Sequence, residues 1–318
     1  MQIQQRGSRE NAGVPRFVIL GASGMLGRAW TAALERNGIP FLALSRKHVD
    51  YTDPAELDRA LGRKTDWVVN CSGYTDVDGA EREPHAAFES NSRFVKQLGD
   101  TCFQSETGVI HYSTDYVFDG RASQPYTTQH KPSPANVYGH SKAEGELSLL
   151  ESGCKSLIIR TSWLFAAHGK NFLRTMMSLL RERDKINVVS DQIGRPTCVR
   201  HLVRNSLALI NRQQTGIHHV TNGGQASWYE FAQVIGKSAN YACEIAPCST
   251  DEFPRPANRP AFSVLDLSRT EDCLGQMPDW RTSVQATVAE LLGKTEPSHA
   301  HHQQNSALTS DFQLEPLS

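Results

Sequence analysis

Tyr138 and Lys142 are the residues of this sequence whose types and spacing could most directly do chemistry. They stand four positions apart in the run Tyr-Gly-His-Ser-Lys, which places both on one face of a helix, one turn apart. A lysine cation beside a phenol favours the phenolate, so it lowers the phenol's pKa from its usual value near ~10. Such a phenol can exchange a proton with a carbonyl or alcohol oxygen near neutral pH. Two solvated side chains are the alternative interpretation, and the other motifs of the chain have to decide between the two.

A glycine-rich loop near the start of the chain predicts a phosphate-binding turn. The apolar run 17–20 ends at Gly21, and Gly21-Ala22-Ser23-Gly24-Met25-Leu26-Gly27 then opens a helical pattern. In this position Gly21 permits a tight turn, Gly24 lets the backbone approach a pyrophosphate, and Gly27 lets the helix pack closely on the sheet. The start of the helix adds free N–H groups and the positive end of its dipole. We therefore expect a dinucleotide site, the alternative being a glycine-rich turn of structural importance only.

The end of the second apolar run, 41–44, indicates which dinucleotide binds. In such folds a carboxylate here accepts a hydrogen bond from the ribose of NAD, whereas an arginine accommodates the 2′-phosphate of NADP. This chain has Ser45-Arg46-Lys47 there, and no carboxylate before Asp50. Because a guanidinium suits a phosphate dianion, the pattern favours NADPH, with NADH kept as the alternative cofactor. A solvated loop cation is the other interpretation of Arg46.

Short apolar runs alternate with amphipathic helices through the first half of the chain, which predicts an α/β fold. The expected architecture is a Rossmann-like doubly wound parallel sheet with a smaller C-terminal substrate-binding lobe. The expected strands are 17–20, 41–44, 67–69, 109–112 and 157–159, and the expected helices of this half include 54–61 and 84–98. The predicted organisation is a disordered lead-in at 1–15, an NADP-binding domain at 16–165 that includes the Tyr138 helix, a mainly substrate-binding lobe at 166–293 from which some segments return to the main domain, and a disordered tail at 294–318.

Composition narrows the class of partner. The net charge is -1, with acidic and basic residues interspersed, so no broad field attracts nucleic acid or an anionic membrane. No apolar run approaches the roughly 20 residues of a membrane-spanning helix, and the polar start lacks the apolar core of a signal peptide. The seven cysteines include no Cys-x-x-Cys pair. These features predict a reduced, cytoplasmic enzyme whose partner is a small molecule in a pocket.

Several separate motifs resemble the dTDP-4-dehydrorhamnose reductase family of the extended short-chain dehydrogenase/reductase superfamily. The most specific are Ser113-Thr114-Asp115-Tyr116-Val117-Phe118-Asp119-Gly120 and the Asn136-Val137-Tyr138-Gly139-x-x-Lys142 run that follows it. The resemblance covers residues 16–292 and also rests on the glycine loop and on the runs 74–81, 160–165, 191–197 and 259–263. It implies NADPH-dependent reduction of the C4 ketone of a nucleotide sugar, dTDP-4-dehydrorhamnose, to dTDP-L-rhamnose.

The resemblance also assigns roles to particular residues. It implies that Tyr138 donates the proton, that Lys142 tunes Tyr138 and holds the nicotinamide ribose, and that Thr114 hydrogen-bonds the substrate's carbonyl oxygen. Asp115 and Trp163 are implied substrate contacts, although Asp115 could instead cap a turn and Trp163 could belong to the core. The further residues that the resemblance places around the cofactor are Gly24, Met25, Leu26, Ser45, Arg46, Asp50, Tyr51, Gly73, Tyr74, Thr75 and Tyr112, which join Gly21 and Ser23 of the loop.

The sequence departs from the family in ways that leave alternatives open. The small-residue run that follows the third strand reads Asn70-Cys71-Ser72-Gly73, which should still admit the cofactor. Some family dimers hold Mg²⁺ on carboxylates just past the glycine loop, where this chain has Arg28-Ala29-Trp30; a structural Mg²⁺ is therefore not expected, and a homodimer is left open. The alternative functions are a related C4-ketoreductase or epimerase acting on another nucleotide deoxysugar, and a non-catalytic NADP-binding regulatory subunit like the beta subunit of methionine adenosyltransferase.

Overall fold

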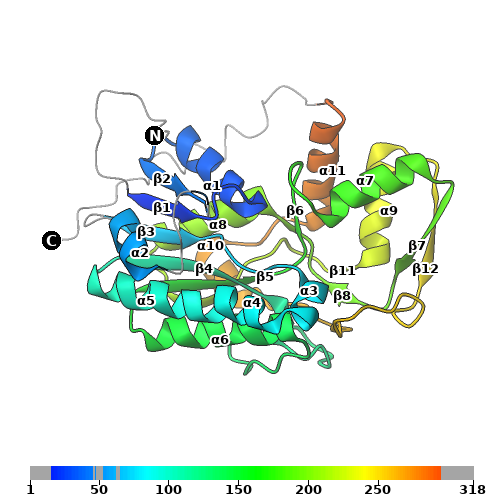
Figure 1. Ribbon diagram of the computed structural model, residues 1–318. Helices are drawn as coiled ribbons and strands as arrows, with labels where there is room; N and C mark the ends of the chain where they lie inside the picture. Colours follow the sequence, from blue (N-terminus) through cyan, green and yellow to red (C-terminus); the bar gives the residue numbers. More distant parts are fainter. Residues whose placement is uncertain (1–15, 46, 48–52, 62–64, 295–318) are drawn as a thin grey trace.

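A six-stranded parallel sheet forms the centre of the protein, which a computed structural model describes for residues 16–45, 47, 53–61 and 65–294. The strand order is β10-β5-β4-β3-β1-β2, and every neighbouring pair is parallel (Figure 1). The strands are β1 (Phe17–Leu20), β2 (Phe41–Leu44), β3 (Trp67–Asn70), β4 (Gly108–Thr114), β5 (Ser156–Thr161) and β10 (Gly216–His219). A parallel sheet is buried on both faces, which explains why its strands are nearly continuous apolar runs.

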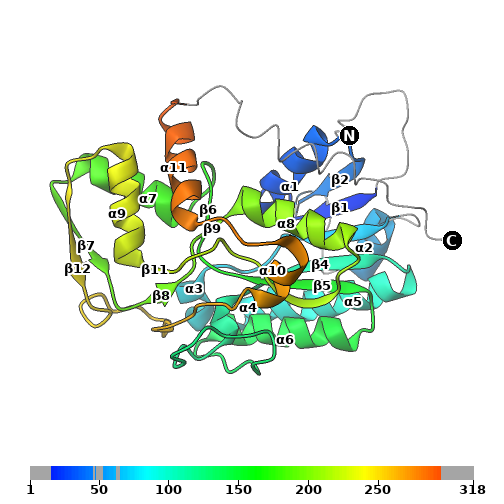
Figure 2. The same ribbon diagram turned by 180° about the vertical axis from the view of Figure 1, so that it is seen from behind.

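Helices cover both faces of this sheet, so the predicted Rossmann-like doubly wound architecture is confirmed (Figures 1 and 2). Alternate residues of each strand enter opposite layers: Ile19 and Ile110 pack with the helices α1 and α8, whereas Val18 and Val109 pack with α2, α5 and α6. The helices of the two layers are α1 (Met25–Arg36), α2 (Pro54–Leu61), α3 (Val77–Arg82), α4 (Pro84–Phe88), α5 (Phe94–Gln104), α6 (Val137–Glu151), α8 (Val199–Asn211) and α10 (Ser268–Leu274).

A second apolar core lies beyond one end of the sheet, where the remaining helices gather (Figure 1). Its buried side chains include Leu173, Phe231 and Trp280. The elements on this side are β6 (Leu164–Phe165), α7 (Phe172–Glu182), β7 (Lys185–Val189), β8 (Ile193–Gly194), β9 (Thr197–Cys198), β11 (Ala226–Ser227), α9 (Trp228–Ala239), β12 (Glu244–Cys248) and α11 (Trp280–Leu291). Between these elements in the sequence, β10 and α8 rejoin the central sheet, because β10 pairs with β5 and α8 packs on the first core.

One predicted helix differs in detail from the observed one. The pattern at 84–98 predicts a single helix, but the structure has α4, then a π-helical segment at Glu89–Arg93, and then α5 up to Gln104. A single π turn widens the helix locally, and such turns are frequent at functional sites. The widened turn carries Asn91, whose side chain faces the pocket described below.

The order of strands fixes where a ligand can bind. The chain runs from β1 outward to β2 and then crosses back to β3 on the other side of β1. In open α/β sheets the crevice at the carboxyl ends of the strands, at such a reversal, is the binding site. Gly21, Cys71 and Thr114 lie at the ends of β1, β3 and β4 and line a pocket there. A bilayer-crossing helix is not found in the described part of the chain.

Candidate active site

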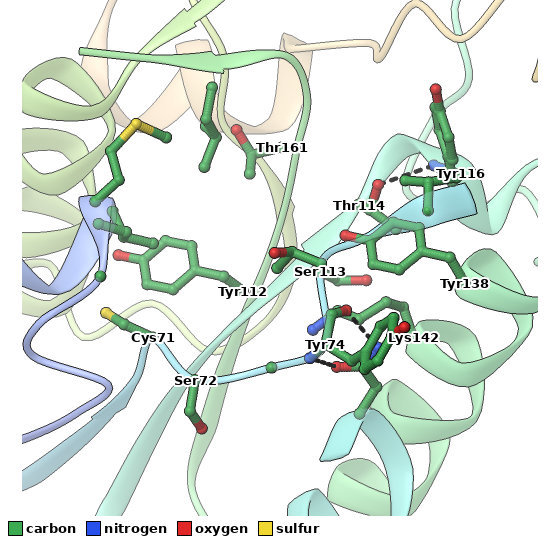
Figure 3. A pocket seen from close by; sticks show the side chains of 18 of the residues that line it. Cys71, Ser72, Tyr74, Tyr112, Ser113, Thr114, Tyr116, Tyr138, Lys142 and Thr161 are labelled. Carbon is green, nitrogen blue, oxygen red and sulfur yellow. Dashed lines mark hydrogen bonds between the residues drawn. The ribbon is translucent and has the colours of Figure 1, made fainter. Parts of the chain in front are cut away.

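A cavity of about 1240 Å³ opens at the carboxyl ends of β1, β3, β4 and β5. Figure 3 shows Tyr138, Thr114 and Ser113 together at the end of β4, with Cys71 and Tyr112 on the other side of the pocket. Two buried hydroxyls in its wall, Ser113 Oγ and Thr161 Oγ1, have no hydrogen-bond partner among the described residues. Buried polar atoms are normally satisfied. The cavity is therefore built for a polar ligand.

The glycine loop forms one end of the cavity and has the geometry that a pyrophosphate needs. Gly21 adopts φ +77°, and a Cβ there would lie 2.8 Å from the carbonyl carbon of Cys71. A Cβ on Gly27 would overlap the carbonyl oxygen of Gly21, so only glycine lets α1 approach the turn this closely. Helix α1 starts directly after Gly24, which has no side chain to cap the first N–H groups. These N–H groups are thus available to an anionic ligand.

The cavity brings together most of the residues that the sequence places around a cofactor. Gly21, Ser23, Gly24, Met25, Leu26, Gly73, Tyr74, Thr75, Tyr112, Tyr138 and Lys142 all line it. Ser45 follows β2 and lies outside this lining, while Arg46, Asp50 and Tyr51 fall outside the described residues. Tyr112 uses its hydroxyl within the protein, because it accepts a hydrogen bond from Trp30 Nε1 at 2.8 Å and pairs with Ser206 Oγ at 2.8 Å.

Tyr138 stands in the first turn of α6, beside Thr114 at the end of β4. Asn136 caps the helix by accepting a hydrogen bond from Gly139 N at 2.8 Å. A Cβ at position 139 would overlap the carbonyl oxygen of Tyr116. Because Gly139 has none, the start of the helix can pack directly on the segment after β4. The phenol of Tyr138 and the hydroxyl of Thr114 thus lie in one site, where the Thr114 hydroxyl acts to lower the pKa of the phenol.

The prediction that Lys142 lowers the pKa of Tyr138 is wrong for the protein without bound cofactor. Desolvation in the pocket raises the pKa of Tyr138 to about 12, and the nearby Asp115 carboxylate adds to this, while only the Thr114 hydroxyl opposes it. Desolvation also lowers the pKa of Lys142 to about 8, against the opposing effect of Glu146, so the charge of this lysine is not fixed above that pH. Its Nζ lies 3.2 Å from Nε2 of the buried His111. Burial decides the direction of both pKa shifts, and helical spacing does not reveal how deeply a side chain is buried.

The two residues implied as substrate contacts both line the cavity. Asp115 is buried, accepts hydrogen bonds from Thr114 Oγ1 at 3.0 Å and Ser263 Oγ at 2.6 Å, and has a pKa raised to about 6 by desolvation. Trp163 adopts φ +47° and stacks on Trp228 with ring centroids 3.6 Å apart. Both residues therefore combine structural contacts with a place in the wall.

Two further residues of the site, Asn91 and Trp228, escape sequence reasoning. Asn91 accepts a hydrogen bond from Tyr74 N and donates to Tyr74 O, both at 2.9 Å, and also donates to Ser141 Oγ at 3.0 Å. It thereby ties the loop after β3 to α6. Trp228 enters the wall from the second core. Arg259 also lines the cavity, and it belongs to the run 259–263 that the sequence had marked. The only local signal was an asparagine in the middle of a helical pattern, which is unusual.

Metal ligands do not gather within the described residues: no three His, Cys, Asp or Glu side chains lie together there.

A doubly wound parallel sheet with a glycine loop, and with a tyrosine and a lysine of one helix at its switch point, defines a dinucleotide-binding enzyme of the Rossmann class. The chain belongs to the family described as RmlD substrate binding domain, whose model matches residues 15–292. A dTDP-4-dehydrorhamnose reductase of Burkholderia thailandensis is 38% identical over 298 residues, which are 88% of this chain and 100% of the relative. A dTDP-4-dehydrorhamnose reductase of Streptomyces griseus is 36% identical, over 88% of this chain and 95% of its own.

Solved structures show the same likeness. The crystal structure of a dTDP-4-dehydrorhamnose reductase from Bacillus anthracis, in complex with NADP, aligns with a TM-score of 0.83 at 34% identity, covering 87% of this chain and 99% of its own. A dTDP-4-dehydrorhamnose reductase ortholog from Clostridium acetobutylicum aligns with a TM-score of 0.84 at 33% identity over 87% and 99% of the two chains.

Proposed function

We propose that this protein is an NADPH-dependent oxidoreductase that reduces the C4 ketone of dTDP-4-dehydrorhamnose to the alcohol of dTDP-L-rhamnose. The observation that carries the proposal is the meeting of Thr114, Tyr138 and Lys142 in one cavity with the glycine loop. Relatives with the name dTDP-4-dehydrorhamnose reductase match nearly the whole described chain and support this substrate.

The residues present fit a dinucleotide. The cradle at Gly21, Gly24 and Gly27 leaves space that a Cβ would fill, and the uncapped start of α1 offers N–H groups to a pyrophosphate. Gly73, Tyr74 and Lys142 would hold the nicotinamide end. When bound, NADPH supplies the hydride for the ketone carbon. A relative's structure with NADP supports this choice of cofactor, with NADH as the alternative.

The roles of the protein's own groups follow from their geometry and acidity. Reduction of a ketone places negative charge on its oxygen, which Thr114 Oγ1 and the Tyr138 hydroxyl would stabilise by hydrogen bonding. Tyr138 would then donate its proton to that oxygen. Because its pKa is raised to about 12, the phenol of the free protein is fully protonated at neutral pH, the state that a proton donor requires.

The sugar nucleotide would enter between the two cores. Asp115 would accept a hydrogen bond from a sugar hydroxyl, and the ring of Trp163 would cover an apolar face of the sugar. Arg259, whose Nε is buried and has no hydrogen-bond partner among the described residues, would face the diphosphate. We extend the proposal to the division of the chain: residues 16–165 mainly bind the cofactor, and residues 166–293 mainly bind the substrate.

A related C4-ketoreductase is the second candidate. A relative from Streptomyces antibioticus with the name probable dTDP-4,6-dihydroxy-2-methyloxan-3-one 4-ketoreductase is 35% identical over 89% of this chain and 97% of its own. Turnover of the purified protein with several 4-keto sugar nucleotides distinguishes the two. The epimerase alternative is supported by fold alone, since a UDP-glucose 4-epimerase of Thermus thermophilus is only 19% identical.

The test of the proposed function is oxidation of NADPH by the purified protein in the presence of dTDP-4-dehydrorhamnose. We expect Tyr138→Phe to lower kcat by about 100-fold or more while NADPH still binds, because a general acid typically contributes this much. Tyr241→Phe, in the second core, is the matched control and should keep wild-type turnover. Turnover of Tyr138→Phe within a few-fold of wild type would refute the assignment. A protein that binds NADPH but reduces none of the keto sugars would favour the regulatory-subunit alternative.

Location and assembly complete the proposal. A reducing, cytoplasmic location is supported by the seven cysteines, all of which are free thiols. A homodimer is supported by the exposed apolar side chains of Phe103 on α5 and of Leu147 and Leu150 on α6, two helices that pack side by side (Figure 1). Sedimentation velocity of the purified protein measures this, and a monomer at micromolar concentration would contradict it.

A further inference from the structure

A chain of buried side chains runs from the loop after β3 to Lys142. Asn70 ends β3, and His111 lies beside it in register on β4. Asn70 Nδ2 is 3.1 Å from His111 Nδ1, and His111 Nε2 is 3.2 Å from Lys142 Nζ. All three side chains are at most 5% exposed. Protein groups therefore supply most of the hydrogen-bond partners of these three side chains.

The orientation of the Asn70 amide is fixed at the other end of the chain. Asn70 Oδ1 accepts hydrogen bonds from the backbone N–H of Ser72 at 3.1 Å and from Ser72 Oγ at 2.6 Å. A backbone N–H can only donate, so Oδ1 must face Ser72, and the amide NH₂ group must face His111. Nδ1 of His111 can then only accept. Since a neutral imidazole has one N–H, that proton has to be on Nε2.

This tautomer restricts what Lys142 can be. A lysine ammonium has three donors and no acceptor, so it cannot pair with an Nε2–H group, whereas an uncharged amine can accept from it. An imidazolium is excluded for the same reason, because both of its neighbours would be donors. The contact between Nε2 and Nζ is a hydrogen bond only when the lysine has lost a proton.

The other groups around Lys142 do not outweigh its burial. Glu146 stands one turn further along α6 and raises the pKa of Lys142, but less than desolvation lowers it. Both oxygens of Glu146 are bound by the buried Arg160 of β5, at 2.9 Å from Nε and 2.6 Å from Nη2. Tyr138, one turn back, is a neutral phenol, because desolvation raises its pKa to about 12. Burial holds His111 neutral by lowering its pKa, and Lys142 lowers that pKa further whenever the lysine is charged.

We propose that His111, held as its Nε2–H tautomer by Asn70, is a positioning residue that favours the uncharged amine of Lys142. The lysine beside Tyr138 is then a group that gains and loses its proton within the working pH range, and not a permanent cation. The structural part of this proposal is independent of turnover. Its link to catalysis rests on the proposed function.

The test is an NMR measurement of ¹⁵N-histidine-labelled, cofactor-free protein, in which long-range ¹H–¹⁵N couplings report the tautomer. The His111 resonance is identified by its absence from His111→Gln. At a pH one unit above the titration of Lys142, whose pKa is about 8, we expect the Nε2–H tautomer in the wild type. Its ¹⁵N shifts should also change as Lys142 titrates. An Nδ1–H tautomer or an imidazolium at that pH would overturn the proposal.

Asn70→Asp reverses the direction of the hydrogen bonds between residue 70, His111 and Lys142, with little change in the shape of the side chain. One carboxylate oxygen can still accept hydrogen bonds from Ser72. The other now accepts a hydrogen bond from the Nδ1–H group of His111, so Nε2 becomes an acceptor for the lysine ammonium. We expect the Nδ1–H tautomer. We also expect Lys142 to lose its proton at a pH at least one unit higher than in the wild type. Ser72→Ala keeps the backbone N–H and should keep the wild-type tautomer. An unchanged tautomer and titration in Asn70→Asp would contradict the proposal, and the wild-type measurement decides it even if the variant does not fold.

Discussion

Trp163 shows at the scale of a residue how the pocket wall is held in place. Its backbone has φ +47°, a region that is unfavourable for a bulky residue. Such strain persists only when the surroundings determine it. Here the indole stacks on Trp228 at an interplanar angle of 9°, and it covers Gly194, where a Cβ would lie 2.6 Å from the Trp163 ring. Phe172 and Gln192 in turn hold Trp228, through ring packing and a hydrogen bond of 3.2 Å.

We therefore expect Trp228→Leu to raise the KM for the sugar nucleotide by about 3- to 10-fold, since an aromatic pair contributes about 0.5–1.5 kcal/mol beyond its buried area. The dissociation constant of NADPH should change less, because Gly21, Gly24 and Gly27 come from the turn between β1 and α1 and not from the elements that hold Trp228. Trp228→Phe keeps a stacking partner and should stay near wild type. Steady-state kinetics and a fluorescence titration with NADPH separate these effects; an equal loss in both parameters would mean a general structural role for Trp228.

Spacing alone could predict which residues meet in the site, but not their electrostatics. Tyr138 and Lys142 share a helix turn, and Thr114 ends a strand, so local periodicity was sufficient to place them. The pKa of a phenol depends on groups from other elements and on solvent, which periodicity does not contain. His111 had no visible role in the sequence because its partners, Asn70 and Lys142, come from a different strand and a helix.

At the scale of an element, Asn136 at the start of α6 both caps the helix and binds a neighbouring loop. Asn136 Oδ1 caps the helix that carries Tyr138, while Asn136 Nδ2 donates to Asn258 O at 2.8 Å. The loop around Asn258 also binds Asp78 of α3, which accepts from Arg259 Nη2 at 3.2 Å and from Ala257 N at 3.3 Å. The helix with the proposed proton donor and the loop with Arg259 are thereby fixed to each other.

Two substitutions at Asn136 should separate these functions. Asn136→Ser keeps a capping oxygen but removes the amide donor to the loop, so we expect the smaller change in the free energy of unfolding together with a higher KM for the sugar nucleotide. Asn136→Ala removes both and should also lower the free energy of unfolding by about 0.5–2 kcal/mol, the usual value of an N-cap. Urea unfolding and steady-state kinetics measure the two effects. If Asn136→Ser leaves the KM unchanged, the loop is not held through this contact.

The same scale shows which elements the sequence could predict. The five apolar runs expected as strands are all strands of the central sheet, because burial on both faces leaves an unmistakable apolar pattern. The two-residue strands β6, β8, β9 and β11 were not predicted, since such short pairs depend on neighbours distant in sequence. The π-helical turn at Glu89–Arg93 was also missed, because one inserted residue hardly alters a helical pattern.

At the scale of the whole molecule, buried histidines link folding to pH. His111, His201, His218 and His219 are at most 7% exposed. Desolvation lowers the pKa of His201 and of His218 to about 4 and that of His219 to about 3, each with help from a neighbouring arginine. That of His111 also lies well below its ordinary value. The folded protein therefore keeps all four histidines neutral at pH values where the unfolded chain, with ordinary histidine pKa values near ~6.5, binds protons.

Near and below pH ~6.5 the unfolded state binds more protons than the folded state. The free energy of unfolding must therefore fall as the pH drops from about 7.5 to 5.5. Each buried histidine should contribute about 1.4 kcal/mol over this interval, and the four together about 5 kcal/mol, as upper estimates. Asp115 acts in the opposite direction, because its pKa of about 6 lets the folded state take up a proton, but it offsets less than one histidine. Urea unfolding at the two pH values measures the loss. His218→Leu should reduce it by about one histidine's share, whereas His140→Gln, at an exposed position of α6, should leave it unchanged. A free energy of unfolding that is equal at both pH values would show that the histidines are not held neutral by the fold.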